Sequence, residues 1–255
     1  MLFRSGFLIH WNGRCLLFDP YLSDSLTRKY ASTDKPHVRI SEQVIDPGLL
    51  TGIDIVTSSH NHTDHLDAET LRPILAHNPG IRLVIPEANR SFVCERLSCE
   101  HDFPTGVLDG VDSIIGDFSF TGVPAAHNEI ERDEKGRCRF LGYLVRFGEW
   151  KVFHSGDTLY HPGLVSALKR VKPDVVFLPI NGNDPSRRVA GNMNGSEAAK
   201  LAKEIHARLV IPHHFQLFEF NTAEPDLFEA SCLSIGQSFV TMKLGEKLHI
   251  DRKSI

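Results

Sequence analysis

The sequence predicts an α/β protein, because apolar segments typical of buried strands alternate with segments of helical pattern. Residues 53–57 form a short apolar run, and Asp67 after it is a typical N-cap for a following helix. Residues 174–180 are almost continuously apolar, as in a strand buried on both faces, and residues 209–215 form another expected strand. Polar side chains follow these strands, and α/β folds place their chemistry on such loops.

The other elements follow from the same patterns and from the turn residues between them. An Asn-Gly pair at 12–13 is the strongest short hairpin signal. A glycine followed by an acidic residue predicts further turns at 116–117, 148–149 and 245–246. In chain order we expect a hairpin of 7–11 and 14–19, a strand at 83–86, a helix at 87–97, a hairpin within 112–121, a hairpin of 140–147 and 150–154, a helix at 164–171, a helix at 197–205 capped by Ser196, a loop and helix within 219–233, and a hairpin of 239–244 and 247–250. We find no linker or repeat, so we expect one domain over residues 1–255.

Two features near the N-terminus lie outside these regular elements. Residues 25–46 are polar, irregular and contain proline, and we expect a surface excursion that borders the active site. Asp19 ends the second expected strand. It is interpreted either as the cap of a turn or as a hydrogen-bond acceptor behind a metal site.

The composition is that of an ordinary soluble globular protein, with 41% hydrophobic and 24% charged residues. The net charge of −4 argues against a large nucleic-acid partner. The five cysteines include no Cys-x-x-Cys pair, and we expect reduced structural thiols. No stretch approaches the ~20 apolar residues of a membrane span, and the first residues lack the features of a signal peptide. We therefore expect a cytoplasmic protein with no membrane partner.

Residues 58–67 place three histidines and two aspartates within ten positions. His60 and His62 alternate around one residue, so both side chains can reach one point from a short extended segment. Asp64 and His65 follow after one more residue and can turn toward a second point beside it. Two neighbouring points lined by nitrogen and oxygen are what a two-metal hydrolytic site needs. The His-Glu-x-x-His pattern of helix-borne protease sites is absent.

Three later strand ends supply further candidate ligands. Taken singly, His127 is a capped or solvated residue and Asp157 a turn aspartate, but the cluster at 58–67 favours both as ligands. Asp157 follows a glycine at the end of an expected strand, and its two oxygens could bridge two cations. His213 and His214 end the last expected strand, and one of them should close the site.

The long loop after residues 174–180 carries candidates for substrate binding. It combines amides with two arginines, which suits a polar, anionic substrate, although the same composition also fits a solvated turn. The candidate substrate contacts are Asn181, Arg187, Arg188 and Asn192.

These motifs together resemble the metallo-β-lactamase-fold superfamily, in the family's order and over nearly the whole chain. The matching set is His60-x-His62-x-Asp64-His65, His127, Ser155-Gly156-Asp157 and Ile211-Pro212-His213-His214. Residues 19–24, 178–182, 191–194 and 197–198 are similar to the L-ascorbate-6-phosphate lactonase branch of that superfamily.

The resemblance implies a four-layer αβ/βα sandwich, with two mixed β-sheets inside, helices on the outer faces and the metal site at one edge. It implies one ion on His60, His62 and His127, a second on Asp64, His65 and the last histidine, and Asp157 as the bridge. For that last ligand we expect His214, with His213 as the alternative, because family members place one residue between the proline and the ligand.

The implied chemistry is hydrolysis of an ester-like bond. Two divalent ions that share a water lower its pKa and make a hydroxide nucleophile. The expected catalytic residues are Asp64, which also takes a proton from the nucleophile, and His154, which with His161 flanks Asp157. Zinc is the expected metal for nitrogen and oxygen ligands, with manganese or iron as alternatives. The expected substrate is a small anionic molecule, first a lactone of a phosphorylated sugar acid.

Two rival functions use the same ligands. One is a metal-dependent phosphodiesterase or nuclease that acts on a small nucleotide or nucleic acid, and the other is a non-catalytic metal-binding or redox protein. We do not expect β-lactam hydrolysis, because a fold does not fix a function. A homo-oligomer is compatible with the sequence.

Overall fold

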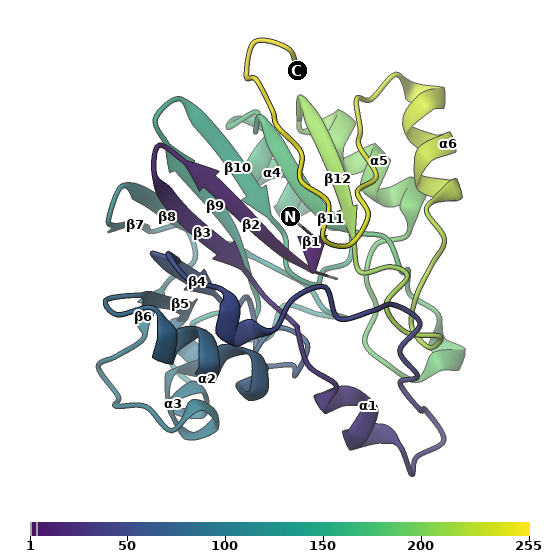
Figure 1. The fold of residues 1–255 in the computed structure, drawn as a ribbon. Helices are drawn as coiled ribbons and strands as arrows, with labels where there is room; N and C mark the ends of the chain where they lie inside the picture. Colours follow the sequence, from purple (N-terminus) through teal and green to yellow (C-terminus); the bar gives the residue numbers. More distant parts are fainter. Residues whose placement is uncertain (1, 4) are drawn as a thin grey trace.

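The computed structural model describes residues 2–3 and 5–255, with side chains from Ser5 onward. Two six-stranded sheets stack face to face, and helices cover their outer sides (Figure 1). Both sheets contain parallel and antiparallel pairs. This confirms the four-layer sandwich of mixed sheets expected from the sequence.

The first sheet contains the six N-terminal strands in chain order. These are β1 (Leu2–Phe3), β2 (Gly6–Trp11), β3 (Arg14–Phe18), β4 (Ile55–Thr57), β5 (Arg82–Pro86) and β6 (Thr105–Val107). Strands β1 to β3 pair antiparallel, and the pairs from β3 to β6 are parallel. Trp11 pairs with Arg14 across the Asn-Gly turn, which confirms the first predicted hairpin.

The second sheet repeats this plan with the later strands, in the order β12-β11-β10-β9-β8-β7. Its strands are β7 (Asp112–Ile115), β8 (Phe118–Pro124), β9 (Leu141–Phe147), β10 (Trp150–His154), β11 (Val175–Pro179) and β12 (Leu209–His213). Strand β11 lies between two parallel neighbours and is buried along its whole length, as its apolar sequence predicted. The predicted hairpins of β7 with β8 and of β9 with β10 are also confirmed.

Most helices begin and end where the sequence indicates. The helices are α1 (Ser25–Tyr30), α2 (Ala68–His77), α3 (Arg90–Leu97), α4 (Pro162–Lys169), α5 (Gly195–Glu204) and α6 (Asp226–Ile235), with short 3-10 turns at Pro47–Leu49, Glu87–Asn89 and Pro185–Arg187. Asp67 caps α2 as predicted, and its carboxylate accepts a hydrogen bond from the Thr70 amide. Helix α5 is capped by Asn194 and not by Ser196, because Asn194 and Glu197 form a reciprocal capping box.

Successive side chains of a strand point to opposite faces of its sheet, so each sheet packs against the other sheet on one face and against helices on the other. In β3, Leu16 and Phe18 point into the apolar core between the sheets, while Leu17 packs with Leu71 and Ile74 of α2. Each sheet is therefore covered on both faces. This rigid support fixes the positions of the loops at the strand ends.

Two segments differ from the sequence-based expectation. The excursion at 25–46 contains the short helix α1, which buries Leu26, and it borders the site as expected. Residues 239–244 and 247–250 form no hairpin. The segment around Phe239 instead hydrogen-bonds to β12, with the Val210 amide donating to the Ser238 carbonyl and the Val240 amide to the Val210 carbonyl.

The loops that follow β4, β8, β10 and β12 converge at one edge of the sandwich, the lower edge in Figure 1. No helix among the described residues combines the length and apolar character needed to cross a membrane.

Candidate metal centre

The loop after β4 folds into a tight turn that carries four candidate ligands. The amides of His65 and Leu66 both donate to the His62 carbonyl, at 3.1 and 2.8 Å. Arg96 of α3 supports the turn from outside, because its guanidinium donates to the carbonyls of Asn61 at 2.7 Å and Leu66 at 3.3 Å. The loop is therefore held by its own backbone and by a neighbouring helix.

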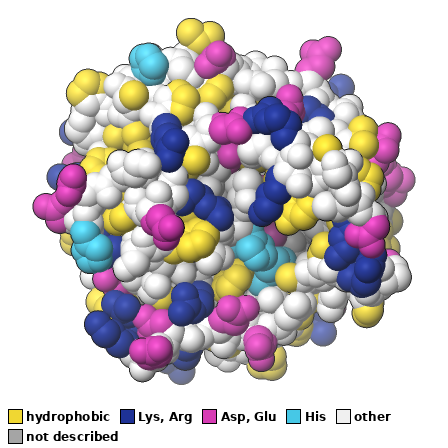
Figure 2. All heavy atoms as spheres, turned by 90° about the horizontal axis from the view of Figure 1, so that it is seen from below, with side chains coloured by type: hydrophobic (Ala, Val, Ile, Leu, Met, Phe, Trp, Pro, Cys, Tyr) yellow, Lys and Arg dark blue, Asp and Glu magenta, His cyan; other side chains and the backbone are white. Residues whose placement is uncertain are grey.

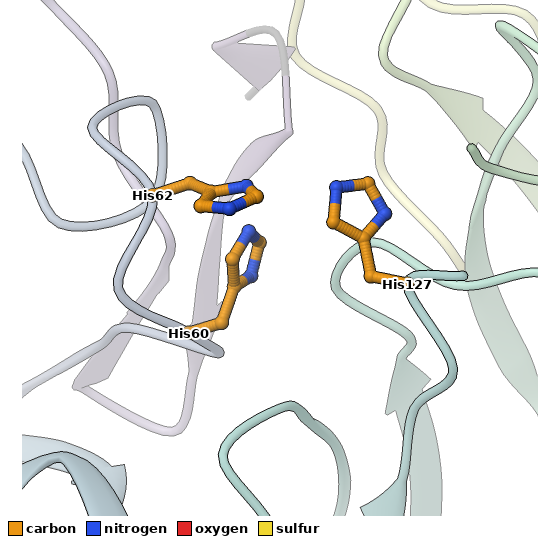
Figure 3. Close-up of side chains that lie close together, drawn as sticks. All are labelled: His60, His62 and His127. Carbon is orange, nitrogen blue, oxygen red and sulfur yellow. The ribbon is translucent and has the colours of Figure 1, made fainter. Parts of the chain in front are cut away.

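The candidate ligands form two groups. Figure 3 shows the first, in which two imidazoles from the β4 loop face His127 from the loop after β8. The first group consists of His60, His62 and His127, and the second of Asp64, His65, Asp157 and His214. Within each group the potential ligand atoms lie within 4.8 Å of one another. These are the seven positions that the sequence predicted.

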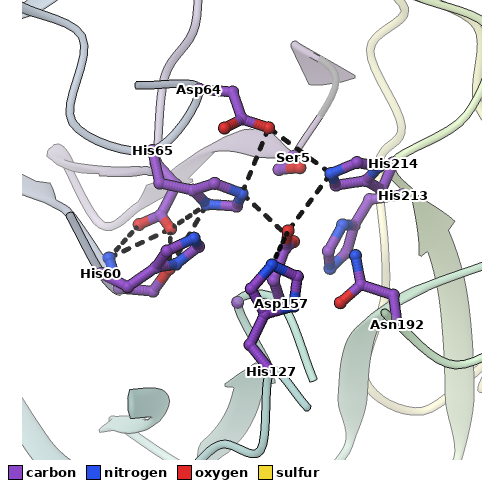
Figure 4. A network of polar contacts seen from close by, with 12 residues as sticks. Ser5, His60, Asp64, His65, His127, Asp157, Asn192, His213 and His214 are labelled. Atoms are coloured by element: carbon purple, nitrogen blue, oxygen red, sulfur yellow. Dashed lines mark hydrogen bonds and ion pairs between the residues drawn. The ribbon is translucent and has the colours of Figure 1, made fainter. Parts of the chain in front are cut away.

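Asp157 lies between the groups (Figure 4). One of its oxygens is 3.1 Å from His65 Nε2, and the other is 3.2 Å from His214 Nε2 and 3.8 Å from His127 Nε2. Asp64 completes the second group, with Oδ2 at 3.5 Å from His214 Nε2 and 3.8 Å from His65 Nε2. A carboxylate that faces both groups is suited to bridge two cations.

Of the two histidines after Pro212, His214 is the one that enters the second group. His213 is still part of β12, and its buried ring lies beside Ser155, with Nε2 3.5 Å from the hydroxyl oxygen. His214 follows the strand in a left-handed backbone conformation, with φ of 62°. This change in chain direction turns its ring toward Asp157.

Several imidazoles are oriented from behind. His127 Nδ1 donates to the Gly191 carbonyl at 2.8 Å, and His65 Nδ1 donates to Asp19 at 2.7 Å, so that Nε2 of each ring faces the centre. The Ser59 hydroxyl is 3.0 Å from Nδ1 of His60. Partners of this kind fix the tautomer and the direction of metal-binding histidines.

Asp19 is an acceptor behind the centre, which decides between the two roles that the sequence left open. Its buried carboxylate accepts hydrogen bonds from His65, from the Ser59 amide and hydroxyl, and from the Thr57 hydroxyl. Burial opposes its charge, but the hydrogen bond from His65 and the nearby imidazoles outweigh burial, so the pKa of Asp19 lies below its usual value. Through His65 and Ser59, this one carboxylate supports both groups.

The electrostatics of the two groups differ. Burial lowers the pKa of His60 and His127 below the usual value. His62 is exposed at the cleft, but partial desolvation by the surrounding residues lowers its pKa to about 4. Burial also opposes a charge on His65, but Asp157 and Asp64 outweigh it and raise the pKa of His65 well above its usual value. Burial of Asp157 is outweighed in the same way by His214 and His65, so its pKa is strongly lowered. The second group therefore attracts positive charge.

The donor set fits divalent cations. Among the described residues, the buried Nε2 of His60 has no hydrogen-bond partner, and His65 Nε2 and Asp157 Oδ1 make no well-aligned hydrogen bond. Leaving His60 Nε2 buried without a partner is costly, and a cation would satisfy it together with the poorly aligned His65 and Asp157 atoms. Nitrogen and oxygen donors without sulfur suit zinc, manganese or iron.

The two halves of the molecule, each built around one of the two sheets, come into close contact directly beside Asp157. Gly156 has a φ of 58°, and a Cβ placed there would lie 2.6 Å from Ser59 Oγ. Glycine is therefore required both by the backbone conformation and by the space. The loops after β4 and β10 touch at this point.

The expected catalytic role of His154 has no support in this geometry. Its ring is fully buried and stacks on Phe18, its Nε2 donates to the Ser5 carbonyl at 2.6 Å, and its Nδ1 accepts from the Gly156 amide at 3.2 Å. It ends β10 facing the space between the sheets, so it supports the loop and does not reach the cleft. His161 caps α4, because its Nδ1 accepts from the Leu164 amide.

The predicted substrate residues divide into two kinds. Arg188 lines the cleft above the ligands, while Asn181, Arg187 and Asn192 are outside the cleft lining found among the described residues. Those three instead connect to one another and to Asn221, which does line the cleft: the amide of Asn192 donates to Asn181, and Arg187 donates to the Asn181 carbonyl and to Asn221. They hold the loop in place.

The cleft has a volume of about 580 Å³ and opens over the ligand groups. Its walls include residues that the sequence did not indicate as functional, namely Lys29, Tyr30, Lys35, His37, Phe92, Arg96 and Asn221. His37 is buried and stacks on Tyr30, with ring centroids 4.6 Å apart. The polar composition of residues 25–46 indicated part of this wall from the sequence. No sequence feature indicated the residues of α3 or Asn221.

Comparisons with known proteins agree with this architecture. Residues 14–215 match the model of the Beta-lactamase superfamily domain. A UPF0173 metal-dependent hydrolase of Aeropyrum pernix is 25% identical over 245 residues, covering 90% of this chain and 88% of that protein. The isothiocyanate hydrolase from Delia radicum gut bacteria has a TM-score of 0.77 to this structure, with 16% identity and 97% of both chains covered.

A second solved structure, the metallo hydrolase Igni18 of Ignicoccus hospitalis, has a TM-score of 0.69 with 20% identity, and the alignment covers 96% of this chain and 94% of that one. At such identities the solved structures show the fold alone. The family model covers most of the chain, and the chain belongs to the beta-lactamase superfamily.

Proposed function

We propose that this metal-dependent hydrolase of the beta-lactamase superfamily cleaves an ester-like bond in a small anionic substrate, first a lactone of a phosphorylated sugar acid. Two divalent ions would serve it, with zinc as the default and manganese or iron as alternatives. The observation that carries the proposal is the convergence of seven ligand side chains on two adjacent points beneath one cleft.

The first group would hold one ion on His60, His62 and His127, and the second group another on Asp64, His65 and His214. Asp157 would contact both. When bound, such ions supply a water nucleophile at neutral pH and polarise the oxygen of the attacked group. Only two of the seven ligands are carboxylates. Two divalent ions would therefore leave the centre positive, which favours an anionic substrate and the negative charge that develops in ester hydrolysis.

The chain's own residues have three tasks in this scheme. The Asp64 carboxylate, 3.5 Å from His214 Nε2, would take the proton from the nucleophile. Asp19 keeps His65 oriented through its Nδ1. The side chains of the cleft wall bind the substrate and exclude part of the surrounding water.

The cleft supports an anionic substrate because its wall is cationic although the chain as a whole has a net charge of −4. Lys29, Lys35, Arg96 and Arg188 all line it. A cationic wall beside a hydrolytic centre attracts and orients small anions.

The test combines metal analysis with a substrate panel. Protein purified without added metal would be analysed for bound metals and then assayed on lactones, carboxylic esters and phosphodiesters, with and without a chelator. We expect close to two metal ions per chain, and lactone or ester hydrolysis that the chelator abolishes. Fully loaded protein that turns over no member of the panel would contradict the proposal and favour a non-catalytic metal-binding protein.

A second candidate is a phosphodiesterase that acts on a small nucleotide. The observation in its favour is that Tyr30 and Phe92 line the same cleft as the cations, and aromatic rings can stack on a base. Bis-p-nitrophenyl phosphate assayed beside a lactone separates the two candidates. Faster turnover of the phosphodiester would favour the second.

A further inference from the structure

The cationic side chains around the cleft are not equivalent. Figure 2 shows Lys and Arg side chains bordering the hollow in which histidine is visible. Arg96 is committed to the turn after β4, where it donates to two carbonyls, and Arg188 forms an ion pair with Asp34. Among the described residues, Lys29 and Lys35 have no carboxylate within ion-pairing distance. The charges of these two lysines are therefore not neutralised by a described carboxylate, and each ammonium group has further N–H donors for an anion from solution.

The two lysines are placed beside the centre. Lys29 Nζ is 3.5 Å from the hydroxyl of Thr63, which stands in the chain between His62 and Asp64. Lys35 Nζ donates to the Arg188 carbonyl at 2.5 Å, so it reaches the loop on the opposite wall. Both line the same cleft as the ligands.

The segment that carries these lysines is well anchored. The Thr27 hydroxyl donates to the His37 carbonyl at 2.7 Å, which closes the segment into a loop. The His37 ring stacks on Tyr30 and makes an edge contact with Phe218, while Leu26 is buried below. The ammonium groups are therefore presented from a fixed backbone, which reduces the entropy lost when an anion binds.

We propose that Lys29 and Lys35 form a subsite for a second anionic group of the substrate, remote from the bond that is cleaved. This inference rests on the proposed function. The group is a phosphate monoester or a carboxylate, because both are bound by ammonium donors. The subsite makes the enzyme prefer substrates with charge at the far end over their neutral counterparts.

The test uses matched ligands that differ only at the far end of a six-carbon acid. Gluconate, glucarate and phosphogluconate carry a hydroxyl, a carboxylate and a phosphate there, and their affinities for the metal-loaded protein would be measured by calorimetry. Turnover of gluconolactone and of phosphogluconolactone would be measured in parallel. The variants are Lys29→Met and Lys35→Met, and Lys169→Met, an exposed lysine of α4, is the control for loss of one positive charge.

We expect wild-type protein and Lys169→Met to bind phosphogluconate more tightly than gluconate. In each cleft variant this preference should fall by about ten- to hundred-fold, the size of a lost hydrogen bond to a charged group. Lys29→Arg should retain part of the preference, because it keeps the charge. The affinity of glucarate distinguishes a subsite for any anion from one that needs phosphate.

Two outcomes separate this inference from the proposed function. An unchanged preference in both cleft variants, with metal content and thermal stability as in wild type, would overturn the subsite. Charge-dependent binding that disappears in the variants, without turnover of either lactone, would support the subsite and contradict the proposed lactonase activity.

Discussion

The two ligand groups of the centre are built differently. The first consists of three neutral imidazoles, and the second combines two imidazoles with two carboxylates. Because the second group contains the negative charge, it should bind a divalent cation more tightly than the first. We therefore predict that an ion on the second group would be retained more firmly than one on the first.

The solvent exposure of the ligand side chains also predicts that the second group binds its cation more tightly than the first. The side chains of Asp64, His65, Asp157 and His214 are at most 13% exposed, whereas His62 of the first group is exposed at the cleft. The two groups also share support, since Asp19 contacts His65 directly and reaches His60 through Ser59. A test of the comparison must therefore distinguish changes in one group from changes in both.

Replacing Asp157 with asparagine should have the largest effect, because it removes the charge that faces both groups. We expect kcat/KM to fall by about a thousand-fold, comparable to the loss of a major electrostatic contact in an active site. Metal content, measured by elemental analysis, should fall at both groups. Asp102→Asn, at an exposed position, is the matched control and should retain metal and activity.

Breaking the groups one at a time should give unequal results. His62→Ala should lower metal content by about one ion per chain, while the remaining ion still resists a weak chelator. His65→Ala removes a ligand of the tighter group and should leave no ion that resists the same chelator. Equal chelator sensitivity in the two variants would contradict the ranking of the groups.

A change at Asp19 should have a smaller effect that reaches both groups. Asp19→Asn keeps the size of the side chain but removes the charged acceptor of the bond from His65. Metal affinity should fall by about ten- to hundred-fold, as is usual when the partner of a ligating histidine is lost. Competition with a chromophoric chelator would measure it. A loss confined to the first group would show that the direct contact with His65 is unimportant.

The smallest effect is expected at Thr57, which contacts Asp19 and none of the candidate ligands directly. The Thr57 hydroxyl donates to Asp19 at 2.6 Å, and Thr57→Val removes this bond with little change in volume. The free energy of unfolding should fall by about 1.5–3 kcal/mol, the range for a hydrogen bond to a charged group. Denaturant unfolding would measure it, and metal affinity should change by less than in Asp19→Asn.

The sequence predicted most of the fold because its strands are apolar and its turns carry strong signals. The Asn-Gly hairpin and the buried strand β11 are both as expected. Helix α1 was missed because its six residues are too few for a periodic pattern. The prediction of a last hairpin was wrong. A glycine turn indicates where the chain reverses, but the segment around Phe239 pairs with the neighbouring edge strand β12 and not with residues 247–250.

The seven ligand positions were predictable because each follows a strand that points to the same edge. The direction of individual side chains was not. His154 lies three residues before Asp157, but it belongs to the strand and faces the core, whereas Asp157 follows the turn at Gly156. Lys29 and Lys35 could not be chosen from a charged segment without knowing which side faces the cleft.

The contact of Gly156 with Ser59 has a consequence for re-engineering the protein. The backbone of Gly156 packs against the side chain of Ser59 and sets the distance between the two halves beside the ligands. A larger residue at either position would push the two halves apart. New substrate preferences are therefore better sought in the cleft walls at 26–37 and 188–190, which lie away from this contact.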